Sequence, residues 1–195
     1  MKLDYIWSPK NDLFIRTDLG LIEEMFGGLG GEILYRPFNK RYAIGFTGHY
    51  LKQREYKQLL GFQDYKVFSG HLNTYFKLPQ DVLLQVHAGR YLAKDTGITF
   101  DISRRFKTGF RIGIFATKTN ISSGEFGEGS FNKGFYFSIP LDLYFSDYRS
   151  GNIGFSMSPL TRDGGAMLYN HNSLFGIFGE TNKDSIDRDI NDLLK

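Results

Sequence analysis

The feature that most constrains the fold is an alternation of apolar and polar residues at every second position. From about Tyr42 onward it recurs in segments of roughly ten residues, as where Phe100 and Ile102 flank Asp101. Successive side chains of a β-strand point to opposite faces, so each segment predicts a strand with one apolar and one polar face. The 23 Gly, 5 Pro and 16% aromatic residues also favour extended sheet. We expect an all-β chain of about eleven antiparallel strands.

The connections between these segments are predicted to alternate in length. Weaker strand candidates lie at Lys2–Trp7, Leu13–Leu19, Glu32–Arg36 and Ala166–Phe178. Antiparallel neighbours place successive turns at opposite ends of a sheet, so one end would carry tight turns and the other longer loops. The short connections are Ser8–Asp12, Pro37–Arg41, Pro79–Asp81, Phe106–Gly109 and Ser146–Gly151; those between them are Gly20–Gly31, Lys52–Asp64, Leu92–Gly97, Asn120–Lys133 and Leu160–Gly165.

Two folds fit this alternation. A membrane barrel has strands of about 9–11 residues with the apolar face toward lipid, whereas a soluble sandwich or lipocalin-like barrel turns that face inward. Strand length, loop asymmetry and aromatic stripes favour the first. The sequence therefore predicts an antiparallel up-and-down transmembrane β-barrel or partial barrel of about 10–12 strands over residues 1–179. A polar C-terminal tail, 180–195, would be a short amphipathic helix or a frayed terminus.

Composition excludes several classes of protein. With 195 residues and 41% hydrophobic content, the chain fits one folded domain. No cysteine is present, so disulfides, iron–sulfur clusters and thiolate zinc sites are excluded. The net charge of +3 is too small to indicate a nucleic-acid-binding protein. Residues 1–10 lack the apolar region of a signal peptide, so we expect either a cytoplasmic chain or a piece of something longer.

The remaining motifs give no catalytic, cofactor or metal site. The run Gly27–Glu32 resembles a phosphate loop only loosely, because a strand rather than a helix should follow it, and we expect a tight loop at the barrel rim. The carboxylate pairs Glu23/Glu24 and Glu125/Glu128 suit a glycosidase in number, but both are expected to be solvated loop charges. His49, His71 and His87 fall on polar faces of successive strands, where they could line one lumen or share a metal, and separate polar lining is the default expectation.

Several stretches together resemble one known family. They run in order over residues 13–170 and comprise Glu24–Gly28, Gly31–Pro37, Gln53–Arg54 with Gly61–Tyr65, Gly70–His71, Gly89–Asp95 with Gly97, Glu125–Gly134 and Pro159–Ala166. In these residues the chain resembles the YjbH family of exopolysaccharide or group-4-capsule biosynthesis proteins, outer-membrane β-barrel lipoproteins of Gram-negative bacteria.

The resemblance implies a barrel that helps to export or assemble a surface polysaccharide, beside a Wza-like outer-membrane export protein. Family members are longer and carry a signal sequence. The resemblance therefore implies one of three alternatives: this chain is a C-terminal portion, it comes from a split gene with a separate N-terminal half, or its start is mis-assigned. It carries over no catalytic residue.

We therefore expect a non-enzymatic outer-membrane component of exopolysaccharide biosynthesis and export, in contact with lipid and polysaccharide. The residues predicted to contact the polymer, in the lumen or the loops, are His71, His87, Asp101, Arg111, Glu125, Glu128, Arg162 and Asp163. One alternative is a soluble lipocalin-like barrel that binds a hydrophobic ligand. Another is a polysaccharide-modifying enzyme that uses the Glu125/Glu128 loop.

Overall fold

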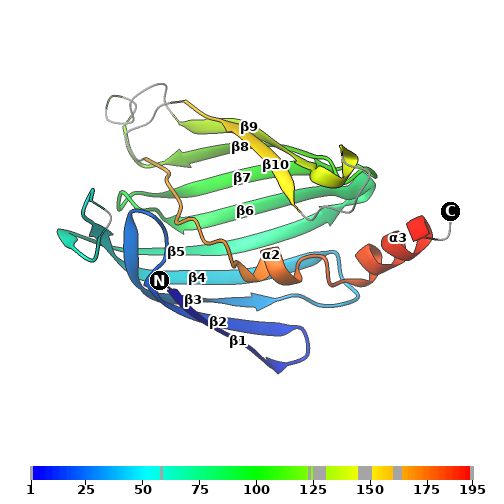
Figure 1. The fold of residues 1–195 in the computed structure, drawn as a ribbon, viewed down its shortest axis with the longest axis horizontal. Helices are drawn as coiled ribbons and strands as arrows, with labels where there is room; N and C mark the ends of the chain where they lie inside the picture. The colour runs from blue at the N-terminus through cyan, green and yellow to red at the C-terminus, as the bar shows by residue number, and fades with distance from the viewer. Residues whose placement is uncertain are drawn as a thin grey trace.

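The chain folds into one antiparallel sheet in which each strand pairs with its neighbours in sequence (Figure 1). The computed structural model describes residues 2–57, 59–122, 124, 131–144, 151–159 and 164–193. The strands are β1 Lys2–Lys10, β2 Leu13–Leu21, β3 Phe26–Tyr35, β4 Tyr42–Arg54, β5 Phe62–Leu78, β6 Val82–Arg90, β7 Thr96–Arg105, β8 Arg111–Thr119, β9 Asn132–Pro140 and β10 Asn152–Met157; the helices are α2 Leu174–Phe178 and α3 Lys183–Leu193. This confirms the predicted up-and-down all-β fold and the short helical tail.

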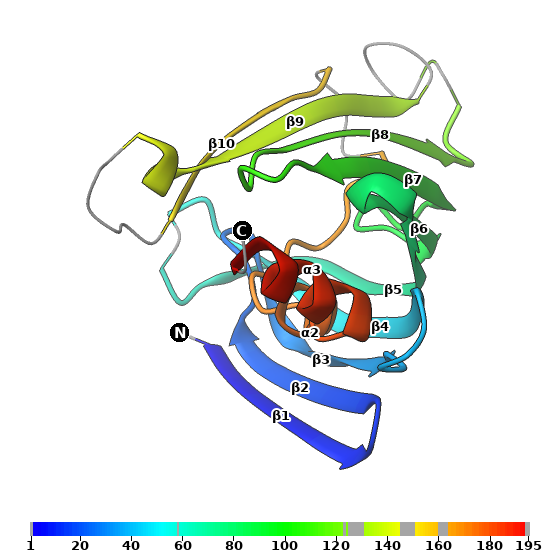
Figure 2. The ribbon, with the colours of Figure 1, turned by 90° about the vertical axis from the view of Figure 1, so that its right-hand side faces the viewer.

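The sheet curls into a trough that is not closed, with β1 and β10 as its two edges (Figure 2). Of the two predicted forms of the sheet, a closed barrel and a partial barrel, the structure has the partial barrel. The segment after β10 crosses the concave side, where α2 lies over the first strands of the sheet (Figures 1 and 2). Within the described residues no helix is long and apolar enough to cross a membrane.

Two sequence-based expectations were wrong. The glycine run is not a loop, because residues 26–35 form β3 and only residues 22–25 connect it to β2. Glycine is needed at position 30, where a Cβ would lie 2.4 Å from the carbonyl oxygen of Gly48 and against the ring of His49. The expected strand Ala166–Phe178 is instead irregular backbone ending in α2.

Loop lengths are also less asymmetric than predicted. The connection 22–25 is shorter than 36–41, although it belongs to the end expected to carry long loops. The reason is that β3 and β5 extend further into the expected loops than the apolar alternation reaches. Residues 123 and 125–130 of the longest expected loop lie outside the described residues.

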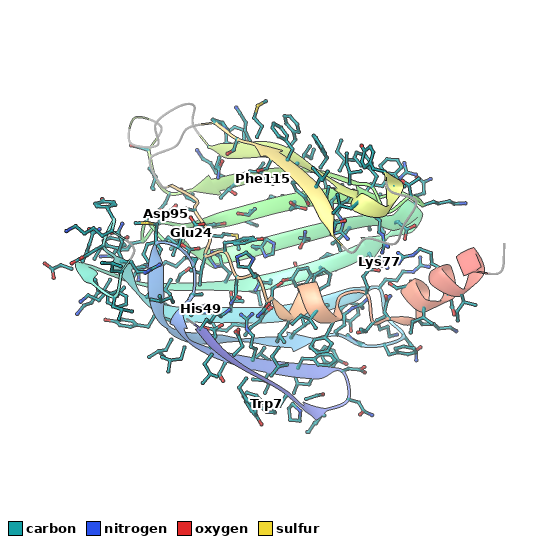
Figure 3. All side chains as sticks on the ribbon, viewed as in Figure 1. Trp7, Glu24, His49, Lys77, Asp95 and Phe115 are labelled. Carbon is teal, nitrogen blue, oxygen red and sulfur yellow. The ribbon has the colours of Figure 1, made fainter. Side chains whose placement is uncertain are left out.

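The two faces of the sheet differ as predicted. The convex face carries apolar side chains that are about half exposed, among them Phe46 at 49%, Phe100 at 49% and Ile114 at 58%. The concave face carries mainly polar side chains, and Figure 3 shows side chains projecting from both faces. Its apolar contacts form two small clusters, one at the β2–β3 turn around Leu51 and one under α2 around Leu34. The C-terminal segment, rather than a second sheet, covers this face.

Candidate functional site

The concave face encloses a polar cavity of about 540 Å³ between β2–β8 and the C-terminal segment. Four of the predicted contact residues, His71, His87, Asp101 and Arg111, line this cavity from four consecutive strands, β5 to β8. They meet because each lies on the inward face of its own strand and neighbouring strands pair in register. The other four, Glu125, Glu128, Arg162 and Asp163, lie outside the described residues.

Hydrogen bonds across the strands hold the polar lining. Nδ1 of His87 lies 2.7 Å from Oδ1 of Asn73 on β5. Asp101 accepts hydrogen bonds from Gln85, at 3.1 Å, and from the Tyr136 hydroxyl, at 2.9 Å. His71 packs edge-on against the ring of Tyr91, and its Nε2 is buried without a hydrogen-bond partner among the described residues. The cavity therefore presents both donors and acceptors, which match the hydroxyl groups of a sugar.

A buried cluster of charges on β2, β3 and β4 borders this cavity. Arg16 contacts Asp18 at 3.1 Å and Glu32 at 3.2 Å, and Nε2 of His49 lies 3.0 Å from Asp18. All four side chains are almost fully buried. Buried charges persist only when they are paired and hydrogen-bonded. Of this cluster, the sequence predicted only that His49 lies on a polar strand face. The spacing of Arg16 and Asp18, two residues apart in a strand candidate, is the signal that could have indicated the rest.

The charge cluster binds the C-terminal segment to the concave face. Glu32 accepts a hydrogen bond from the Leu174 backbone at 2.9 Å, and Asp18 accepts one from the Asn170 side chain at 3.1 Å. Arg16 donates to the backbone carbonyl of Asn172. This segment therefore forms a fixed wall of the cavity opposite the sheet.

Aromatic stacking fixes the end of the same segment. Phe175 stacks on Tyr75 with ring centroids 3.6 Å apart, and Phe178 stacks on Phe14 at 4.1 Å. Leu174 between these contacts is fully buried. The helix α2 begins at Ser173, whose hydroxyl accepts a hydrogen bond from the Gly176 backbone and caps it.

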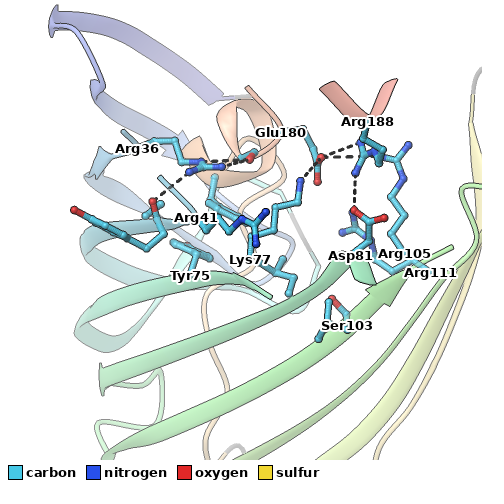
Figure 4. Close-up of a pocket in the computed structure, with 16 residues that line it drawn as sticks. Arg36, Arg41, Tyr75, Lys77, Asp81, Ser103, Arg105, Arg111, Glu180 and Arg188 are labelled. Atoms are coloured by element: carbon cyan, nitrogen blue, oxygen red, sulfur yellow. Dashed lines mark hydrogen bonds and ion pairs between the residues drawn. The ribbon is translucent and has the colours of Figure 1, made fainter. Parts of the chain in front are cut away.

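A second charge cluster, at the end of the sheet that carries the β5–β6 turn, fastens the tail (Figure 4). Glu180 lies 3.2 Å from both Lys77 and Arg188, and Arg188 also contacts Asp81 at 3.2 Å. Burial by itself would raise the pKa of Glu180, but Lys77, Arg188 and a hydrogen bond from Ser185 outweigh it and lower the pKa to about 2. The carboxylate thus stays ionised and bound to its cations at ordinary pH.

Several residues of the stretches that resemble the family hold loops in place at the end of the sheet opposite the β5–β6 turn. The backbone of Arg54 donates to Met25 at 2.8 Å, and its guanidinium donates to the Glu24 carbonyl at 2.7 Å. Asp95 likewise accepts a hydrogen bond from the Gly165 backbone at 2.8 Å. Their described residues therefore join segments distant in sequence.

Within the described residues, no group of three or more His, Asp or Glu side chains is placed to hold a metal ion.

Comparison with known proteins places the chain in a family. The family model for YjbH, described as exopolysaccharide biosynthesis protein YbjH, matches residues 1–180. An uncharacterized lipoprotein, YjbH of Escherichia coli strain K12, is 42% identical over 173 residues. The match covers 86% of this chain and 25% of that protein, so the chain spans about a quarter of the length of this relative. No solved structure matches significantly. The chain belongs to the YjbH family of exopolysaccharide biosynthesis proteins.

Proposed function

We propose that this chain is a non-enzymatic outer-membrane component of exopolysaccharide biosynthesis and export, with its convex face toward lipid and its concave cavity toward the polymer. The family description supports the role in exopolysaccharide biosynthesis. The lipoprotein name of the relative is consistent with a Gram-negative envelope. The mechanism is passive: many weak polar contacts along the cavity hold a sugar chain without trapping it.

The observation that carries the membrane part of the proposal is the apolar convex face. Large apolar side chains on the strands are about 40–60% exposed there, including Leu72, Phe100, Ile112, Ile114 and Phe155. Soluble monomers seldom expose a continuous apolar surface larger than a few hundred Å². The lipocalin-like alternative needs the apolar face inside, which is the reverse of the observed arrangement.

Fractionation of the cell envelope tests the membrane assignment. We expect the chain to be released only by detergent and to migrate differently on a gel before and after heating, because folded membrane barrels resist unfolding by detergent at room temperature. Recovery in the soluble fraction after lysis, with the same migration heated or unheated, would overturn the assignment.

The two open edges of the sheet are evidence for a partner protein that supplies further strands. β1 and β10 each have one hydrogen-bonded neighbour among the described strands. Open sheet edges do not occur in the hydrocarbon region of a membrane, because their backbone groups would be unpaired. We propose that a separate N-terminal half pairs with these edges and that the assembly acts beside a Wza-like export protein. Co-purification of the chain with those two proteins is the test.

Replacement of His71, His87 and Asp101 with alanine tests the role of the cavity. We expect the triple variant to lower polymer export while the amount of heat-shifting protein in the envelope stays the same. A matched control replaces Leu72, Val86 and Ile102, which adjoin the same positions but face the convex side. Unchanged export in the cavity variant would exclude a polymer path through this cavity, and turnover of capsule fragments by the purified chain would instead favour an enzyme.

A further inference from the structure

A small pocket at the end of the cavity collects positive charge (Figure 4). It lies where α2 and α3 meet the ends of β5 to β8. Its lining has two acidic residues, Asp81 and Glu180, and six basic residues, which are Arg36, Arg41, Lys77, Arg105, Arg111 and Arg188.

The acidic groups do not neutralise this charge. Glu180 is shared by Lys77, Arg188 and, at 3.9 Å, Arg105. Asp81 contacts Arg188, which already contacts Glu180. Asp184, outside the lining, pairs with Arg41 at 2.5 Å. Two further carboxylates, Asp101 and Asp12, interact with Arg111 and Arg36, so the six basic residues exceed the nearby carboxylates by one charge.

Two arginines have guanidinium groups available to an anion. Arg111 forms no ion pair with any residue that the structure describes, and the pairing of Arg105 with Glu180 is long. Their side chains lie on the concave side of adjacent strands, paired in register as Arg105↔Arg111. Two arginines on neighbouring strands of one pocket can bind a single carboxylate together, because the planar fork of each guanidinium suits carboxylate oxygens.

The position of the pocket indicates where its ligand comes from. Tyr75, Arg111 and Glu180 line both this pocket and the 540 Å³ cavity, so the two adjoin. The pocket measures about 30 Å³, which suits a small charged group rather than a whole sugar ring. It lies on the polar concave side, whereas lipid in the proposed orientation would contact the apolar convex side. A polymer in the cavity therefore reaches it more directly than a lipid headgroup does.

We propose that this pocket binds the carboxylate of an acidic sugar unit, a uronate, carried by a polymer in the adjoining cavity, with Arg105 and Arg111 as its ligands. The inference rests on the proposed function and narrows its substrate class to acidic polysaccharides. Glu180 already shows that the surrounding cations bind a carboxylate.

Binding of oligogalacturonate to the detergent-solubilised full chain tests the proposal. The comparison probe is a maltooligosaccharide of the same length, which carries no charge. We expect the galacturonate oligomer to bind at least about tenfold more tightly than the neutral one, with affinity falling as salt rises, because charge-assisted contacts dominate. The variant R105Q/R111Q should lose most of this preference.

Arg104→Gln provides the matched control. Arg104 precedes Arg105 on β7 but faces the convex side, where its guanidinium lies 5.0 Å from the centre of the Phe106 ring. It should keep the wild-type preference, and both variants should keep the heat-dependent gel shift.

Three outcomes would overturn the proposal: equal binding of the charged and neutral oligomers, an equal loss in R104Q and R105Q/R111Q, or capture of phosphatidylglycerol vesicles that depends on Arg105 and Arg111 while galacturonate does not bind. Each leaves the membrane assignment standing if the gel shift persists, so failure here is distinct from failure of the proposed function.

Discussion

Loss of Arg16 would remove the guanidinium that the buried carboxylates of Asp18 and Glu32 share. Its guanidinium lies between Asp18 and Glu32 and is 1% exposed. Removing the guanidinium leaves buried carboxylates without their cation, so we expect Arg16→Met to lower the free energy of unfolding by about 3–5 kcal/mol. The measurement is urea unfolding of the chain in detergent micelles. Lys66→Met, an exposed position on β5, serves as control and should change stability by less than about 0.5 kcal/mol.

Glu180 gives the tail a defined pH dependence. Its pKa is lowered to about 2 from an ordinary value of 4.5, so its contribution to docking is fully present above about pH 4.5 and is lost as the pH falls toward 2. Since the side chain is 49% exposed, solvent weakens the effect. Protease cleavage of the tail should be faster in Glu180→Gln than in wild type at pH 7, with the difference disappearing toward pH 2. A rate difference independent of pH would contradict this assignment.

At the scale of elements, α2 depends on one buried side chain. Leu174 is fully buried against Leu34, Ala43 and Tyr75, whereas Ile177 on the same helix is 45% exposed. We expect Leu174→Ala to weaken docking of the C-terminal segment by about 2–5 kcal/mol, because it leaves a cavity. Ile177→Ala should have little effect. Hydrogen exchange of residues 166–180 measures both, and equal exchange in the two variants would show that Leu174 does not anchor the helix.

The same segment shows how far sequence reasoning reaches. Strands such as β5 and β7 could be predicted because the alternation of their two faces leaves a period of two in the sequence. The same period placed His71, His87, Asp101 and Arg111 on the polar face that lines the cavity. The path of residues 166–178 could not be predicted, because it is set by hydrogen bonds to Asp18 and Glu32 and by stacking on Tyr75. These contacts join residues a hundred or more positions apart and leave no local pattern.

The glycine-rich strand illustrates a related limit. Residues 27–31 contain four glycines, which locally favour a loop, yet they pair with both β2 and β4. Strand propensity depends on packing against neighbours more than on the residue itself. The ring of His49, inside the trough, occupies the space that a side chain at position 30 would need.

At the scale of the whole molecule, introduced charges on the convex face distinguish a membrane protein from a soluble one. Only in a membrane does the loss of stability depend on how deep in the bilayer the charge lies. Phe100 lies at the middle of β7 and Leu78 at the end of β5, and both are more than 40% exposed. In a bilayer, Phe100→Arg should destabilise the fold by about 2–4 kcal/mol, and Leu78→Arg, near the interface, by only about 0–1 kcal/mol. In water both positions are already solvated, so the two substitutions should cost the same. Unfolding of each variant in lipid vesicles measures the difference, and equal costs would place the convex face against water or against protein instead of lipid.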